Sequence, residues 1–250
     1  MKTTGKALVI VMVVGILSVI VYGALMRERD KDRTDLARRI VSEGPSTGTT
    51  ESIEEVRRNI ALYEKKIEQH LEDAARTGTY WKILGLRLQD LGLHGEALKA
   101  LEQAIYYLPT DASLHYATGL SAGVMAKSVH AFPGRDNTER EQYFAMAEAA
   151  YLRAIELDGR YLRPRYGLGV LYVFELGRPE DAIPHLQRYL EISRNDVDVL
   201  FVLARAFYML ENYQAAVEVY DRIITLTRDE QKRIDAQNNR QVIMERMYGR

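Results

Sequence analysis

The sequence predicts an all-α chain in which an N-terminal transmembrane helix precedes a stack of helix pairs. Three observations support this fold class. Residues 7–26 contain no charged side chain. Residues 53–74 carry apolar side chains at steps of three or four, which is the period of an amphipathic helix. From residue 78 to about residue 230, small and large apolar residues recur in phase, and such recurrence is typical of a repeat architecture.

The composition excludes several classes of protein. With 34 Lys and Arg against 35 Asp and Glu, the formal net charge is −1, and the basic excess typical of nucleic-acid binding is missing. The chain has no cysteine, which excludes disulfides, thiolate metal sites and a cysteine nucleophile. The 5 histidines lack zinc-site spacing, and no phosphate-loop or nucleophile-elbow motif is complete. We therefore expect neither an enzyme nor a bound cofactor or metal.

The membrane segment follows a short tail, residues 1–6. As a helix, residues 7–26 span roughly 30 Å, the thickness of the hydrocarbon core of a bilayer. A cleaved signal peptide usually has a shorter apolar region of about 7–15 residues. Cleavage after Ala24 would also place the bulky Tyr22 at the −3 position. We therefore predict an uncleaved, single-pass anchor.

The side of the membrane stays open. The flank after the anchor holds more Lys and Arg than the tail before it, which favours a cytoplasmic position for the large domain. A basic tail followed directly by an apolar run is, however, typical of an export signal-anchor, which would place the domain in the periplasm.

The next segment, residues 27–52, is predicted as a charged, flexible spacer, because Gly44-Pro45 and the Ser/Thr/Gly run after it break a helix. An amphipathic helix is expected over 53–77, with Ser52 and Glu55 as a capping box and Gly78 at its end. Its apolar stripe comprises Ile53, Val56, Ile60, Tyr63, Ile67, Leu71 and Ala74. This stripe either packs on the repeats behind it, caps them, occupies their groove, or forms a coiled-coil seam between two copies.

A two-helix unit is clearest over residues 78–111. Its first helix contains W-x2-L-G-x2-L from Trp81 to Leu88, its second contains A-x3-L-x2-A from Ala97 to Ala104, and Pro109 closes it. This pattern resembles the tetratricopeptide repeat, and residues 112–161, 162–196 and 197–230 repeat it in degenerate form. The second of these four units contains an insertion at about 128–142, and the third has one extra residue near Gly177. Residues 231–250 are expected to form a C-terminal capping helix, which Thr227 and Glu230 begin as a capping box.

The resemblance implies a right-handed α-solenoid of about four helix pairs with a concave groove lined by the first helix of each pair. Carried over to this chain, the apolar groove candidates are Leu86, Tyr116, Leu120, Tyr166, Val170, Phe174, Phe201, Arg205, Tyr208 and Met209. Phe132, near the tip of the insertion, is a further contact candidate. Lys82 matches one residue of the carboxylate clamp found in some relatives, but Leu86 stands where that clamp has Asn, so no such clamp is predicted.

The chain thus resembles membrane-anchored bacterial tetratricopeptide repeat proteins. We expect a scaffold that binds a protein or peptide partner in its groove and organises or stabilises a complex at the membrane, without nucleic acid. The alternative is an exported structural protein that self-associates through helix 53–76 and its end repeats into a homo-oligomer.

Overall fold

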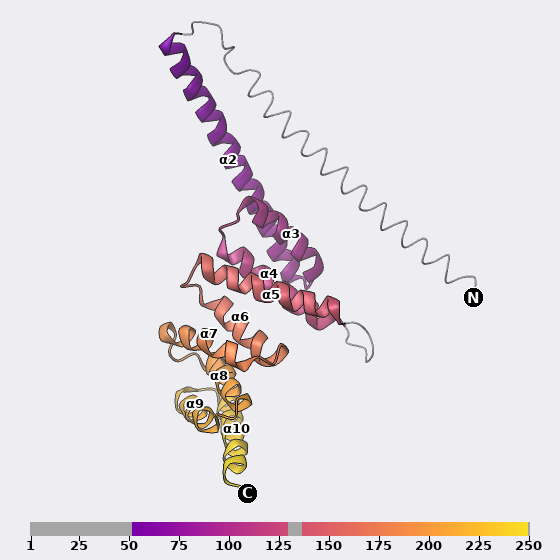
Figure 1. The fold of residues 1–250 in the computed structure, drawn as a ribbon, viewed down its shortest axis with the longest axis vertical. Helices are drawn as coiled ribbons and strands as arrows, with labels where there is room; N and C mark the ends of the chain where they lie inside the picture. The colour runs from indigo at the N-terminus through magenta and orange to yellow at the C-terminus, as the bar shows by residue number, and fades with distance from the viewer. Residues whose placement is uncertain (1–51, 130–136, 250) are drawn as a thin grey trace, which may run out of the picture. The chain divides into compact units, whose positions relative to one another are not determined.

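A computed structural model describes residues 52–129 and 137–249, which form nine α-helices, one π-helical turn and no strand (Figure 1). The elements are α2 (Ile53–Asp90), α3 (His94–Tyr107), α4 (Ala112–Ser128), α5 (Thr138–Leu157), α6 (Leu162–Val170), the π turn η1 (Leu171–Glu175), α7 (Pro179–Ile192), α8 (Val197–Met209), α9 (Tyr213–Leu226) and α10 (Glu230–Tyr248). The predicted anchor 7–26, the spacer up to residue 51 and Phe132 lie outside the described residues. Within the described ranges, no helix is both long and apolar enough to cross a membrane.

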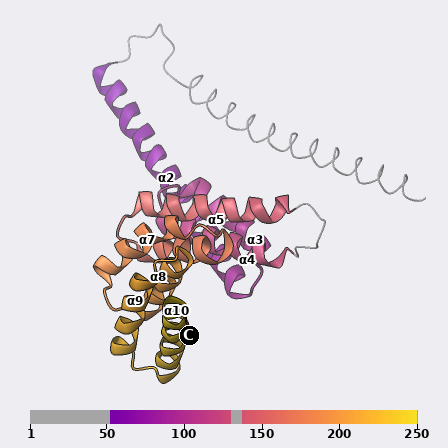
Figure 2. The same cartoon turned by 60° about the horizontal axis from the view of Figure 1, so that its bottom comes forward.

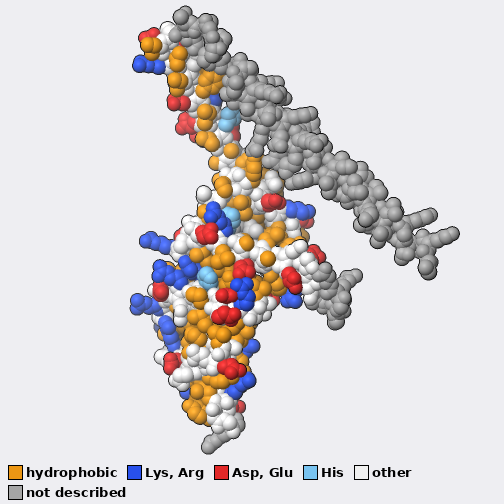
Figure 3. Space-filling model, viewed as in Figure 1, with side chains coloured by type: hydrophobic (Ala, Val, Ile, Leu, Met, Phe, Trp, Pro, Cys, Tyr) orange, Lys and Arg blue, Asp and Glu red, His pale blue; other side chains and the backbone are white. Residues whose placement is uncertain are grey.

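The chain divides into two units, residues 1–66 and 67–250, which we describe separately. The described part of the first unit is the beginning of α2. Its predicted capping box is confirmed: the Ser52 amide donates to Glu55 Oε2 at 2.9 Å, and the Glu55 amide donates to Ser52 Oγ at 3.2 Å. The apolar stripe is exposed here, with Ile53 70% and Ile60 52% accessible. Hydrophobic side chains are accordingly visible along α2 in Figure 3.

The prediction that Gly78 ends the first helix is wrong. The helix continues to Asp90, and Gly78 is buried within it. A β-carbon at Gly78 would lie 2.7 Å from Tyr107 Cβ, so this glycine permits close packing on the end of α3. Two residues after the end of α2, Gly92 has a φ of +75°, which is accessible to glycine, and the Leu93 amide donates to the Leu88 carbonyl at 2.8 Å.

In the second unit, each helix from α3 to α10 packs against the next one along the chain. Together they build an all-helical solenoid (Figure 2). Small residues hold the paired helices close together, as the repeat pattern predicts. A β-carbon at Gly85 would lie 2.9 Å from the Leu101 side chain, and Gly169 faces Leu186 in the same way. Gly167 and Gly169 therefore serve helix packing and are not part of a phosphate loop.

The extra residue of the third unit is accommodated one turn earlier than the sequence indicates. The chain widens into η1 directly after α6, and Gly177 (φ +62°) then turns it into α7. A π turn holds one residue more than an α turn, and such turns are frequent at functional sites. The side chains after Val170 are thereby rotated relative to those of a regular helix.

The predicted start of the last helix also needs correction. The N-cap of α10 is Asp229, whose carboxylate accepts from the Lys232 amide at 3.2 Å. Thr227 is buried and its hydroxyl accepts from the Asp229 amide at 3.2 Å. Thr227 therefore orients the cap residue, because Asp229 offers the stronger, ionised acceptor to the free amides of the first turn.

Candidate functional site

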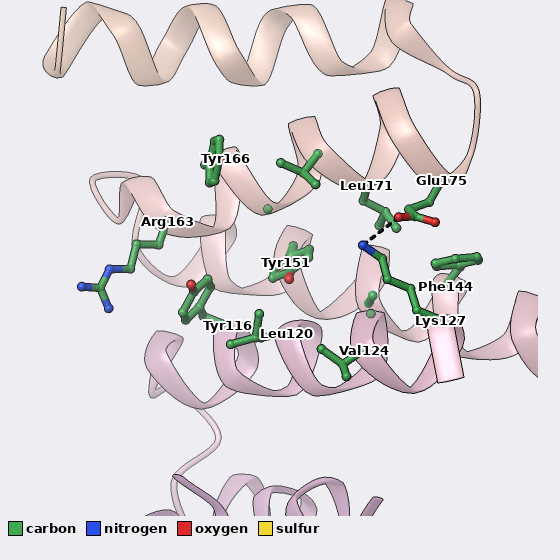
Figure 4. Close-up of a pocket in the computed structure, with 14 residues that line it drawn as sticks. Tyr116, Leu120, Val124, Lys127, Phe144, Tyr151, Arg163, Tyr166, Leu171 and Glu175 are labelled. Atoms are coloured by element: carbon green, nitrogen blue, oxygen red, sulfur yellow. Dashed lines mark ion pairs between the residues drawn. The ribbon is translucent and has the colours of Figure 1, made fainter. Parts of the chain in front are cut away.

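A hollow of about 190 Å³ opens between α4 and α6. In Figure 4, Tyr116, Leu120 and Val124 lie along α4, Tyr166 and Leu171 lie across from them, and Tyr151 lies between the two rows. The full lining consists of Tyr116, Leu120, Gly123, Val124, Lys127, Phe144, Ala147, Tyr151, Arg163, Tyr166, Gly167, Val170, Leu171 and Glu175. The walls are therefore mostly aromatic and aliphatic, and charged side chains stand at the two ends.

Tyr151, on α5, forms the floor of the hollow. A β-carbon at Gly119 would lie 2.6 Å from its ring, and one at Gly167 would lie 2.8 Å from it. The two glycines thus let α4 and α6 pack closely against the Tyr151 ring from both sides. Tyr116 extends the aromatic surface, with its ring centroid 6.0 Å from that of Tyr151.

The hydroxyl of Tyr151 has no hydrogen-bond partner in the described chain, and it is not among the fully buried polar atoms, so it is accessible from the hollow. The residue is 6% exposed, and its hydroxyl makes no hydrogen bond to any described residue. Burial raises the pKa of Tyr151, and the neighbouring Tyr116 raises it further. The group is therefore a neutral donor at physiological pH. Within the hollow this hydroxyl is therefore a donor that water or a bound ligand can engage.

An ion-pair network closes one end of the hollow. The Glu175 carboxylate is 15% exposed and lies 2.8 Å from Lys127 Nζ and 3.8 Å from Arg140 Nη2. The Arg140 guanidinium also stacks over the Phe144 ring at 5.1 Å. Glu175 belongs to η1, so the π turn supplies this carboxylate. Arg163 stands at the other end, as Figure 4 shows.

The hollow brings together four of the groove candidates inferred from sequence, namely Tyr116, Leu120, Tyr166 and Val170. Phe174 does not line it and is 55% exposed, because η1 changes the direction of the side chains after Val170. Leu86 is exposed on α2 and also lies outside the hollow.

The four remaining described candidates, Phe201, Arg205, Tyr208 and Met209, lie on α8. Arg205 occupies the place that Leu120 and Val170 occupy on their helices, nine residues after the N-cap. Its guanidinium lies 5.2 Å from the centre of the Tyr208 ring. Arg246 of α10 donates to the Tyr208 hydroxyl at 2.9 Å. The α8 candidates therefore form a second, more cationic surface that α10 helps to build.

Lys82, the partial match to a carboxylate clamp, is already engaged. Its ammonium lies 2.6 Å from Asp111 Oδ2 and donates to Ser113 Oγ at 2.7 Å. Burial opposes ionisation of Asp111, but these hydrogen bonds outweigh burial and lower its pKa. This polar group joins α2 to the start of α4. Elsewhere in the described ranges, no group of three His, Asp or Glu side chains is placed to hold a metal ion.

Sequence reasoning missed Tyr151, Phe144, Lys127 and Glu175. The groove candidates all come from the first helix of each pair, whereas Tyr151 and Phe144 come from the second helix α5. One signal was present: Gly167 is a second glycine beside the expected small residue Gly169, and it opens α6 to the Tyr151 ring.

These features define an α-solenoid of paired helices with an apolar hollow between successive first helices. Two family models described as tetratricopeptide repeat match residues 140–197 and 173–236. Residues 140–236 of the chain therefore contain tetratricopeptide repeats.

The comparisons with individual proteins agree with this family. Anaphase-promoting complex subunit 3 of Schizosaccharomyces pombe is 28% identical over 133 residues, which are 53% of this chain and 17% of that protein. The match therefore spans a small part of that relative. The crystal structure of YrrB, described as a TPR protein with an unusual peptide-binding site, is 20% identical with a TM-score of 0.56 over 75% of this chain and 84% of YrrB. MamA residues 41 to the end, from Desulfovibrio magneticus RS-1, are 13% identical with a TM-score of 0.53 over 70% of this chain and 97% of that one. At these identities the two structures show a shared fold.

Proposed function

We propose that this chain is a membrane-anchored scaffold that binds a protein or peptide partner across the hollow and the neighbouring α8 surface, and so organises or stabilises a complex at the membrane. The observation that carries the proposal is the hollow itself: an open apolar cavity whose floor holds an unpartnered hydroxyl. Small, mostly apolar cavities with a few polar groups are the usual form of recognition sites. YrrB, which shares the fold, is described as having a peptide-binding site. Families of this fold are typically non-enzymatic, and we propose no catalysis for this chain.

Membrane attachment is the second part of the proposal, and it rests on residues 7–26 alone. Twenty uncharged residues suffice for a spanning helix. Cell fractionation of the full chain and of a chain lacking residues 7–26 tests this part. The full chain should sediment with membranes and resist extraction by alkaline carbonate, and the shortened chain should not. Release of the full chain by carbonate would contradict the anchor. Protease accessibility from each side then decides the orientation.

Partner binding is tested by capture with groove variants. We expect Tyr166→Ala together with Tyr208→Ala to abolish capture of the partner, because both rings lie on the proposed surface. The matched control is Ile192→Ala, which removes an exposed apolar side chain from α7. If the double variant folds and still captures the same protein, the groove proposal fails.

Self-association is a second candidate, favoured by the exposed stripe at the start of α2. Ile53, Val56 and Ile60 present apolar surface at coiled-coil spacing. Light scattering on a chain beginning at Thr50 tests this candidate. A stable dimer that Ile60→Glu dissociates would support self-association, and a monomer at high concentration would rule it out.

A further inference from the structure

We infer that the hollow between α4 and α6 receives one bulky apolar side chain from a short acidic segment of the partner, and that the Tyr151 hydroxyl donates a hydrogen bond to that segment. The inference rests on the proposed partner binding and specifies its chemistry. Three properties of the hollow carry it: its size, its unpartnered donor and the charge at its rim.

The size of the hollow fits a single side chain. Its volume is about 190 Å³, and a cavity of roughly 150 Å³ lined by aliphatic and aromatic residues is known to bind benzene. A phenylalanine, leucine or similar side chain therefore fits between Leu120 and Val170. A whole helix does not fit, so the rest of the segment must lie over the rim.

The hydroxyl of Tyr151 determines which polar group approaches the floor. Because burial keeps this group neutral, it donates a proton and needs an acceptor. Backbone carbonyl oxygens flank every side chain of a peptide, and an inserted apolar side chain brings one of them toward the floor. The bound segment thereby satisfies a donor that the described chain leaves without a partner.

The rim has more positive than negative charge. Lys127 and Arg140 share the single carboxylate of Glu175. At the opposite end Arg163 forms no ion pair within the described ranges, and its polar neighbour is Tyr161. On the α8 side of Tyr166, Asp198 pairs with Lys232, whereas Asp196 accepts from the neutral Tyr189 hydroxyl and keeps its negative charge. Carboxylates at the Arg163 end of the hollow would therefore meet a cation that has no carboxylate partner, and a basic segment would be disfavoured there.

Selection from a phage-displayed library of short random peptides tests the inference, with the full chain in detergent as the target. We expect the enriched peptides to carry a large apolar residue next to Asp or Glu. Replacing that apolar residue with Ala in the best synthetic peptide should abolish binding, and replacing the acids with Lys should weaken it. Enrichment of basic or wholly polar peptides would overturn the inference.

Tyr151→Phe is the decisive variant, because it removes only a hydroxyl that has no partner in the described chain. We expect the affinity for the best peptide to fall about fivefold, the value of one neutral hydrogen bond, while the melting temperature is unchanged or higher. The matched control is Tyr220→Phe, a buried tyrosine on α9 that lies outside the hollow and whose hydroxyl has Asn239 as its polar neighbour. It should change stability and leave affinity unchanged. Arg163→Gln should weaken binding about twofold to fivefold and reduce its salt dependence.

The outcomes separate this inference from the proposed function. If Tyr166→Ala abolishes peptide binding while Tyr151→Phe and Arg163→Gln leave the peptide affinity unchanged, the inference is overturned and groove binding is preserved. Failure to enrich any peptide would also overturn it, because a short segment suffices in our proposal, and the capture experiment would then decide groove binding independently. Enriched sequences that match residues 53–60 of this chain would assign the hollow to a second copy instead.

Discussion

Gly119 and Gly167 lack side chains where α4 and α6 approach the Tyr151 ring, and this pair of residues creates the floor of the hollow. We expect Gly119→Ala to destabilise the protein by about 1–2 kcal/mol, since overpacking a core costs more than the helix propensity of alanine gains. Urea unfolding measures the change. Gly123→Ala on the same helix is the control: its β-carbon would meet nothing within 4 Å, so it should gain up to about 1 kcal/mol. Equal stability of the two variants would contradict the packing described here.

His185 makes the stability of the protein depend on pH. Burial lowers the pKa of His185, and the nearby Arg165 lowers it further, while its Nδ1 atom is buried without a partner. The imidazole of His185 therefore binds a proton more readily in the unfolded chain, where its pKa is near 6.5, than in the folded protein. The stability contributed by neutral His185 is present above pH 6.5 and is lost as the pH falls from there through the lower, folded-state pKa.

We accordingly expect His185→Gln to flatten the fall in the urea midpoint below pH 6.5. The paired carboxylate of Asp111 titrates in a lower pH window, because its pKa is lowered from 3.8, so it does not obscure the effect. An unchanged slope between pH 7 and pH 5.5 in His185→Gln would show that another group is responsible.

At the scale of the elements, caps decide where the helices begin. Asp196 caps α8: its Oδ1 accepts from the amides of Asp198 and Val199 at 3.2 and 3.3 Å, and its Oδ2 accepts from the Tyr189 hydroxyl at 2.7 Å. We expect Asp196→Ala to lower the free energy of unfolding by about 1–2 kcal/mol. Tyr189→Phe removes only the third bond and should cost about 1 kcal/mol. Calorimetry measures the free energy of unfolding of both variants. If both lose the same amount, the two cap hydrogen bonds to the backbone amides contribute nothing, because Tyr189→Phe leaves them intact.

Some elements could be predicted from sequence and others could not, for physical reasons. Local spacing in the sequence was enough to predict three features: the capping box at Ser52, the apolar positions of α3 and the close packing at Gly85. Gly78 was misinterpreted, because a glycine that ends a helix and a glycine that permits close packing have the same sequence signature. Only the position of Tyr107 distinguishes them. The extra residue of the third unit was expected near Gly177, whereas the π turn lies at 171–175, since an extra residue shifts the register without marking the turn that absorbs it.

The candidate site was predictable only in part. The repeat resemblance supplied Tyr116, Leu120, Tyr166 and Val170, because these residues have fixed places on the first helices. Tyr151 could not be inferred in the same way, since a tyrosine at its place in a second helix normally belongs to the core. It reaches the hollow only because two glycines from different helices face its ring.

At the scale of the molecule, the division at residues 66 and 67 predicts that the solenoid folds independently. A chain of residues 67–250 should show a single cooperative transition and keep the unfolding free energy of the full-length protein, because its buried clusters lie wholly within that range. Chemical denaturation followed by circular dichroism measures this. A loss of cooperativity in the shortened chain would show that the preceding residues complete its core.

The central claim, that the partner binds at the hollow between α4 and α6, is tested most directly by site-specific photo-crosslinking in cells. A photoreactive residue at Val170, inside the hollow, is compared with one at Met146, which is exposed on α5 outside the lining. We predict a crosslinked partner from position 170, lost when Leu120 is changed to Asp, and none from position 146. A partner captured from position 146 and not from position 170 would contradict our account of the site.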